Sequence, residues 1–193
     1  MFVTHPSRCA GFSLIELSVA LTIACILLAL GAPSFSGYLQ NARLGSMAKS
    51  IYSGLQTART EAVKLNTNVE FVLTNSSLET STADTVVLDP TGRNWVVRIP
   101  ASASAPASGI EAKSTNDSDI GGVTLAASGP SFMFNSLGGA SGVSMGIALT
   151  NPALGACTPG GPVRCWNVVV SPGGQIRLCS PDNTLAPSDS RAC

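Results

Sequence analysis

The chain has 193 residues, and its eleven Lys and Arg residues balance its eleven Asp and Glu residues, so the net charge at pH 7 is zero. This balance excludes a chain-wide basic surface for nucleic acid, so any polyanion site must be a local patch. Only 11% of the residues are charged, and the many small and polar residues favour an exported, β-rich domain over a cytosolic enzyme. The length accommodates one domain of ordinary size together with one membrane helix.

An apolar segment lies close to the N-terminus. Residues 12–32 read FSLIELSVALTIACILLALGA, and Glu16 is the only charged residue among them. At about 1.5 Å per residue, a helix of this length crosses the roughly 30 Å hydrocarbon core of a bilayer. We therefore expect residues 12–36 to form the transmembrane half of a long N-terminal helix.

Glu16 is the unusual residue of this segment. A carboxylate at the centre of a membrane helix costs on the order of 2.5–3.5 kcal/mol, and less near its end, so it requires a partner. Phe12 lies four residues earlier, and cleavage before it would free an amine that could pair with Glu16 in the same or a neighbouring chain. An ordinary secretory signal, cut near residues 29–31, is the alternative. The acid and the length of the apolar run disfavour it.

The motif GFSLIEL at residues 11–17 resembles the N-terminal signature of type IV prepilins and type II secretion pseudopilins. The resemblance implies that residues 1–11 are a leader peptide, that a prepilin peptidase cuts between Gly11 and Phe12, and that Phe12 is then N-methylated. It also implies that residues 12–36 form the core of a filament after assembly and that Glu16 acts in assembly with other subunits. The implied location is the inner membrane, as a single-pass protein with a periplasmic C-terminal domain, followed by a pilus or pseudopilus.

The resemblance also matches Pro33 to a proline that many pilins carry at this place. Because proline removes a backbone donor from a helix, we expect Pro33 to kink or loosen the helix. Residues 37–193 are then expected to form the periplasmic head, which begins with an amphipathic helix at 38–65. Its apolar residues recur at spacings of three and four and should pack on a sheet: Leu44, Met47, Ala48, Ile51, Leu55, Ala58, Ala62 and Leu65.

Residues 66–193 have the pattern of an antiparallel β domain, so the predicted fold class is α+β and pilin-like. Short β-type runs alternate with turn residues, at Val69–Thr74, Thr85–Leu88, Trp95–Ile99, Val123–Ala126, Ser131–Asn135, Val143–Leu149, Trp166–Val170 and Gln175–Cys179. The last two runs form a C-terminal hairpin around Ser171–Gly174. Residues 100–122 contain few large apolar residues and are predicted to form a mobile surface loop.

Four cysteines near the C-terminus predict two disulfides in an oxidising compartment. Three pairings are open, and the short Pro/Gly turn in CTPGGPVRC favours Cys157–Cys165 together with Cys179–Cys193. A zinc site is the alternative, but no CxxC spacing or neighbouring His supports it. The only histidine, His5, lies in the leader, so no catalytic Ser/His/Asp or Cys/His arrangement is expected after maturation. We expect no enzyme activity, metal or cofactor.

One helix covered by strands with a terminal hairpin resembles the FimT/GspH branch of the pilin family, whose members are minor pilins or minor pseudopilins. The resemblance implies a role in assembling or priming a type IV pilus or a type II secretion pseudopilus. A secreted hydrolase or adhesin would require removal of the whole apolar segment.

DNA uptake in natural transformation is the alternative function. Some FimT proteins that this chain resembles bind DNA through a C-terminal Gly-Arg-x-Arg motif, which residues 174–177 match only in part. Arg177 is present, but Gln175 replaces the first arginine, so one cation for pairing with phosphate is missing. Arg164 and Arg191 would extend a basic patch if the disulfides bring them toward Arg177.

Overall fold

The structure is a computed structural model. It describes residues 11–76, 78, 85–115, 122–141, 144–155, 157, 161, 163–181, 185–186, 188–189 and 191–193, without the side chains of 30–34. The predicted leader therefore lies outside the described residues except for Gly11. The chain divides into two compact units, one ending at Tyr38 and one from Leu39 to Cys193. Each unit is described by itself.

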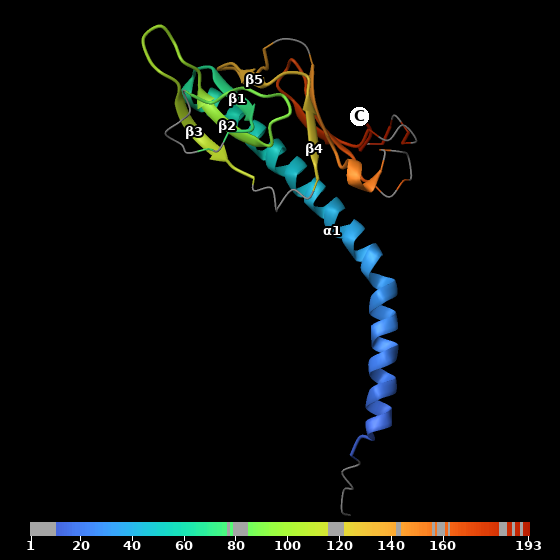
Figure 1. The fold of residues 1–193 in the computed structure, drawn as a ribbon. Helices are drawn as coiled ribbons and strands as arrows, with labels where there is room; N and C mark the ends of the chain where they lie inside the picture. The colour runs from blue at the N-terminus through green and yellow to red at the C-terminus, as the bar shows by residue number, and fades with distance from the viewer. Residues whose placement is uncertain are drawn as a thin grey trace, which may run out of the picture. The chain divides into compact units, whose positions relative to one another are not determined.

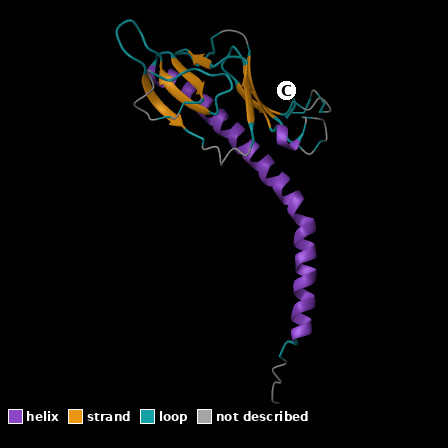
Figure 2. Cartoon of the chain, in the orientation of Figure 1, coloured by secondary structure: helices purple, strands orange, loops and turns teal. Residues whose placement is uncertain are grey.

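Helix α1, Leu14–Leu65, passes through both units (Figures 1 and 2). The backbone stays helical at Pro33, whose side chain lies outside the described residues, so the kink remains a prediction. In the described part of the chain, no helix is long and apolar enough to cross a membrane. The predicted transmembrane segment 12–36 includes positions 30–34, whose side chains are outside that part.

The apolar stripe of α1 packs in the core of the second unit, as its spacing predicts. Leu44, Ile51 and Leu55 have no exposed surface, and Trp95 Nε1 donates a hydrogen bond to Ser50 Oγ at 3.1 Å. Leu65 differs from the prediction because it is 44% exposed, at the last position of the helix.

The end of α1 is closed by a two-bond cap. Asn66 has a φ of 50°, its N–H donates to the Val63 carbonyl, and the Thr67 N–H donates to the Ala62 carbonyl. These bonds form a Schellman motif, which satisfies carbonyls that have no partner within the helix.

Two four-stranded antiparallel sheets pack with α1. The first has the order β3-β2-β1-β5 and the second the order β4-β6-β7-β8. The bounds are β1 Val69–Thr74, β2 Asn94–Ile99, β3 Ser108–Lys113, β4 Thr124–Ala127, β5 Ser131–Phe134, β6 Met145–Thr150, β7 Trp166–Val170 and β8 Ile176–Cys179, with a short 3-10 helix η2 at Pro152–Leu154. One buried cluster joins the helix stripe to large side chains of both sheets, among them Phe71, Phe132, Ile147 and Leu149. Both sheets therefore share one core.

Strand β3 corrects the prediction of a loop at residues 100–122. Ser108–Lys113 pairs with β2, and Ile110 packs against the main core. Ile110 is the only large β-branched residue of this segment, which is too weak a signal to predict a strand, so pairing with β2 decides its structure. Residues 116–121, which also belong to the predicted loop, lie outside the described residues.

The predicted strand Thr85–Leu88 is wrong. β1 is already paired with β2 on one side and β5 on the other, so it offers no free edge to this segment. Val86 instead packs with Val72 and Val96 in a second, smaller cluster. The remaining predicted strands are present. Val69–Thr74 and Trp166–Val170 have the predicted bounds, and the others differ by one or two residues at one or both ends, with Val143 outside the described residues.

Candidate functional site

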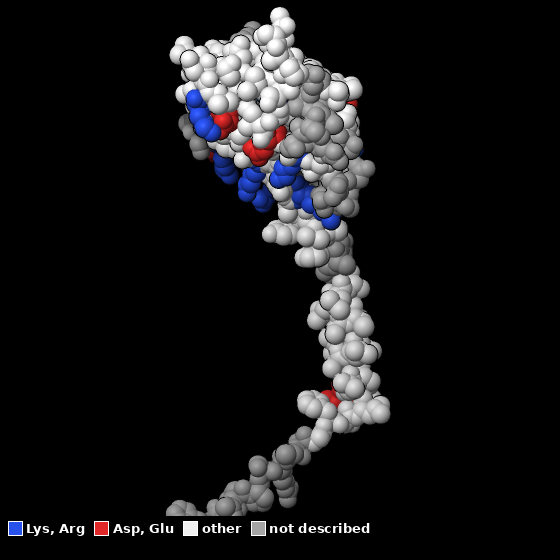
Figure 3. Space-filling model, turned by 90° about the vertical axis from the view of Figure 1, so that its left-hand side faces the viewer, with Lys and Arg blue, Asp and Glu red and all other residues white. Residues whose placement is uncertain are grey.

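The N-terminal unit exposes an apolar helix with a single acid. All described side chains from Gly11 to Ala29 are exposed, including Phe12 at 84% and Leu14 at 85%. The hydroxyls of Ser18 and Thr22 donate to the Ile15 and Val19 carbonyls, both at 2.8 Å. These bonds let both hydroxyls sit in an apolar surrounding. In Figure 3 this segment is almost wholly white.

Glu16 lies in the first turn of α1 and is exposed. Among the described residues it makes no ion pair. The positive end of the helix dipole favours an acid at this place. The nitrogen of Phe12 is an amide in the uncut chain, so it becomes a cation able to pair with a carboxylate only after cleavage. An apolar helix that is exposed on all sides needs lipid or other helices around it.

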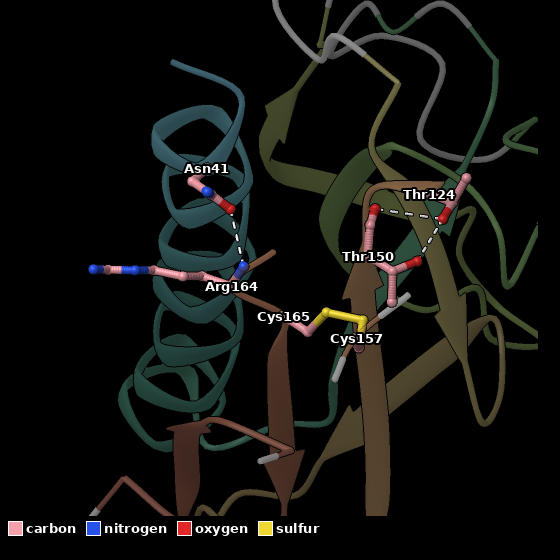
Figure 4. The surroundings of a disulfide bond; sticks show 6 residues. All are labelled: Asn41, Thr124, Thr150, Cys157, Arg164 and Cys165. Atoms are coloured by element: carbon pink, nitrogen blue, oxygen red, sulfur yellow. Dashed lines mark hydrogen bonds between the residues drawn. A yellow bond between two sulfur atoms is a disulfide. The ribbon is translucent and has the colours of Figure 1, made fainter. Parts of the chain in front are cut away.

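Two disulfides crosslink the C-terminal part of the chain. Cys157 pairs with Cys165 at a Cα–Cα distance of 5.9 Å, and Cys179 pairs with Cys193 at 5.2 Å. These are the pairs that the sequence favours. The first ties the segment after η2 to the start of β7 (Figure 4). The second draws the last residues to the end of β8.

Arg177 contacts the last residues of the chain. The side chain is exposed on β8, and Nη2 donates to the Ala192 carbonyl at 3.2 Å. The Ser180 N–H donates to the Arg191 carbonyl at 2.7 Å, and the Cys193 N–H donates to the Ser180 carbonyl at 3.2 Å. The C-terminal segment therefore lies beside Arg177.

The charge of Arg191 is compensated within the chain. Nη2 lies 2.7 Å from Asp189 Oδ2, and Nε donates to Asp189 Oδ1 at 3.1 Å. The hydrogen bonds from the Arg191 side chain and backbone lower the pKa of Asp189 to about 2. The Arg191–Asp189 pair has no net charge, so Arg191 adds no positive charge near Arg177. A short sequence motif does not reveal this compensation.

Arg164 lies beside helix α1. Its backbone N–H donates to Asn41 Oδ1 of α1 at 2.9 Å, and its side chain points away from the disulfide in Figure 4. Arg164 and Arg191 both line a cavity of about 440 Å³ whose wall also includes Trp166 and Leu185, whereas Arg177 does not line it. The structure thus places Arg164 and Arg191 at one cavity and leaves Arg177 outside it. On the face drawn in Figure 3, basic side chains gather along one edge with acidic ones beside them.

Gly174, the first residue of the partial DNA-binding motif, is required by the backbone of the hairpin. Gly174 has a φ of 75°, and a Cβ built there would overlap the Gly138 carbonyl oxygen. Gln175 is exposed and closes the hairpin through its backbone, because its N–H donates to Ser171 Oγ and its carbonyl accepts from the Ser171 N–H. The glycine therefore serves the hairpin whether or not DNA binds.

Sequence reasoning missed the polar contacts that hold α1 to the second sheet. Asn151 is fully buried, its Nδ2 donates to Gln40 Oε1 at 3.1 Å, and its Oδ1 caps η2. Single amides in a helix and a loop give no periodic signal. In the described part of the chain, no group of three or more His, Cys, Asp or Glu residues is placed to hold a metal.

Two family models match the chain. The model described as type II transport protein GspH matches residues 47–174, and the prokaryotic N-terminal methylation motif matches residues 6–32. A search of curated protein sequences found no match.

Solved structures include similar folds. A crystal structure of the type IV minor pilin FimU of Pseudomonas aeruginosa is 15% identical, with a TM-score of 0.53 over 79% of this chain and 98% of that chain. The minor pseudopilin EpsH from the type 2 secretion system of Vibrio cholerae is 13% identical, with a TM-score of 0.45 over 69% of this chain and 94% of that chain. At this identity, the likeness to FimU shows a shared α+β pilin-like fold.

Proposed function

This chain belongs to the GspH family of type II transport proteins, and we propose on that basis that it is a minor pilin or pseudopilin subunit. It is made with a leader, cut between Gly11 and Phe12 by a prepilin peptidase and held in the inner membrane by residues 12–36. It then joins a type IV pilus or a type II secretion pseudopilus and helps to assemble or prime it. Its role is structural, without catalysis.

The observation that carries this proposal is Glu16 in an apolar helix that is exposed on every side. Lipid covers such a surface before assembly, and the helices of other subunits cover it afterwards. In both surroundings the carboxylate favours the nearest cation. The methylated amine of Phe12, on the same or an adjacent subunit, supplies that cation and sets the axial register of the helices.

The two disulfides support export of the head. Disulfides of this kind persist in the periplasm and are rare in the cytosol. Both lie in the unit Leu39–Cys193, which packs its own core and would form the periplasmic domain.

Mass spectrometry of the mature chain, purified from membranes, tests the proposal. We expect an N-terminal Phe12 with one added methyl group. A chain that begins at Ala32 would indicate an ordinary secretory signal and overturn the proposal, and a chain that keeps residues 1–11 would show that no prepilin peptidase acts on it.

DNA binding is the second candidate function, and the observation that favours it is the exposed Arg177 on β8. Arg164 adds an exposed cation, but Asp189 neutralises Arg191. With Gln175 in place of an arginine, the local charge suits only weak binding that falls steeply with salt. Assembly is therefore the function that the geometry favours.

A further inference from the structure

A rigid turn after β5 presents a leucine to solvent. Leu137 is 89% exposed, the highest value among the large apolar residues that the structure describes. Asn135 Oδ1 accepts hydrogen bonds from the N–H groups of Leu137 and Gly139, both at 3.0 Å. The backbone of Asn135 also bonds to Gly138 at 2.8 Å and to Gly139 at 2.9 Å. Four hydrogen bonds thus hold Leu137 in place.

The turn rests on α1 and on the C-terminal hairpin. Gly138 has a φ of 77°, and a Cβ built on it would lie 3.2 Å from both Arg59 Nε and Val63 Cγ2. On the other side, the Ala140 N–H donates to the Pro172 carbonyl at 3.0 Å. Contacts on both sides restrict movement of the turn relative to the last turns of α1.

We call Leu137, Val63 and Arg59 the tip surface. Val63 is 52% exposed, and Leu137 directly precedes Gly138, the residue that lies against Val63 and the half-buried Arg59. Two exposed apolar residues therefore belong to the same small region as this arginine. Among the described residues, the Arg59 guanidinium makes no hydrogen bond or ion pair. Two other cations of this unit are paired with acids, Lys64 with Glu61 at 3.0 Å and Arg98 with Glu70 at 3.0 Å.

We propose that the tip surface docks the head of another pilin-like subunit, which offers a carboxylate to Arg59 beside an apolar hollow for Leu137. This inference rests on the proposed function, because the partner is a subunit of the same filament. The guanidinium has no partner in the part of the chain that the structure describes, so it favours an acid, and a guanidinium–carboxylate pair can be bidentate. Phosphate would also suit Arg59, but a nucleic-acid backbone offers nothing apolar to Leu137 and Val63. Since the turn is already ordered, little side-chain freedom is lost on docking.

The test uses the full chain in cells that assemble the filament. A photo-crosslinking amino acid replaces Leu137, and the adduct is identified by mass spectrometry. Val87 is the matched control position, since it is 69% exposed and lies outside the tip surface. We expect an adduct from position 137, and not from position 87, to a different chain that has its own N-terminal methylation motif. The linked peptide should contain or adjoin an Asp or Glu.

Three further variants test which side-chain chemistry the docking requires. Arg59→Gln should lower the yield of the adduct about tenfold, because it removes the charge from the pair. Leu137→Asp should reduce incorporation into filaments without changing the thermal unfolding temperature of the purified chain, since Leu137 is exposed. A carboxylate-to-arginine change in the partner, combined with Arg59→Glu, should restore the adduct.

The outcomes separate this inference from the proposed function. An adduct to a second copy of this chain, to nucleic acid or to lipid would overturn the proposed docking at the tip surface. The absence of any adduct from a chain whose Phe12 is methylated would overturn it as well. An adduct to another pilin-type head from a chain with unmodified Phe12 would support the tip surface and overturn the proposed maturation.

Discussion

Gly174 lies so close to the Gly138 carbonyl oxygen that no side chain fits between them. The contact joins the turn of the C-terminal hairpin to the turn after β5, and Gly174 also has a φ of 75°. The hairpin that carries Arg177 is thereby held against the turn that carries Leu137.

Replacing Gly174 with Ala should lower the free energy of unfolding by roughly 2 kcal/mol or more, because the new Cβ is strained by its backbone conformation and overlaps the carbonyl. Chemical denaturation of a head fragment, residues 39–193, measures this. Gly173→Ala is the control, since a Cβ there has no neighbour within 4 Å and the φ of Gly173 lies outside the left-handed region. Equal stability of the two variants would contradict the contact.

Replacing Cys193 with Ser should free the C-terminal segment from β8. Opening a disulfide with a sequence separation of 14 should lower the free energy of unfolding by about 3 kcal/mol, chiefly because the unfolded chain gains freedom. Denaturation curves under oxidising conditions report the change. Cys25→Ser in the full chain, at an exposed free cysteine, should leave stability unchanged. A Cys193→Ser variant as stable as wild type would show that the bond contributes nothing.

Replacing Glu16 with Ala should permit membrane insertion but reduce incorporation into filaments, because the carboxylate partner of the Phe12 amine is lost. Insertion itself should improve slightly, since an acid in an apolar helix is costly. The measurement compares the amount of the chain in inner-membrane and sheared-filament fractions. Ser18→Ala is the matched control on the same helix, as it removes only a hydroxyl bonded within the helix. Normal incorporation of the Glu16 variant would refute the assigned role.

Replacing Gln175 with Arg should tighten DNA binding by the head fragment about tenfold at low salt and steepen the salt dependence by roughly one unit of slope. The variant adds a second exposed cation beside Arg177. Titration of duplex DNA at low and physiological salt gives both quantities, with Arg177→Ala expected to weaken any wild-type binding. Lys113→Ala, at an exposed cation on β3, is the control. If Gln175→Arg binds no better than wild type at low salt, the hairpin is not a DNA surface.

The sequence by itself determined the features that depend on local periodicity. The apolar run with Glu16, the spacing of the α1 stripe and the alternation of most strands are each readable within a short window, because the helix and strand repeats are regular. The favoured cysteine pairing was also readable, since the turn between Cys157 and Cys165 is short.

Only the tertiary structure decided the features that depend on distant neighbours. Ser108–Lys113 is a strand because β2 offers it an edge, and Val86 is not in a strand because β1 offers none. Asp189 neutralises Arg191, and Gly138 is held against Arg59 and Val63. Pairing, charge compensation and exposure are set by which segments meet in the folded chain, and no window of sequence contains both partners of a long-range contact.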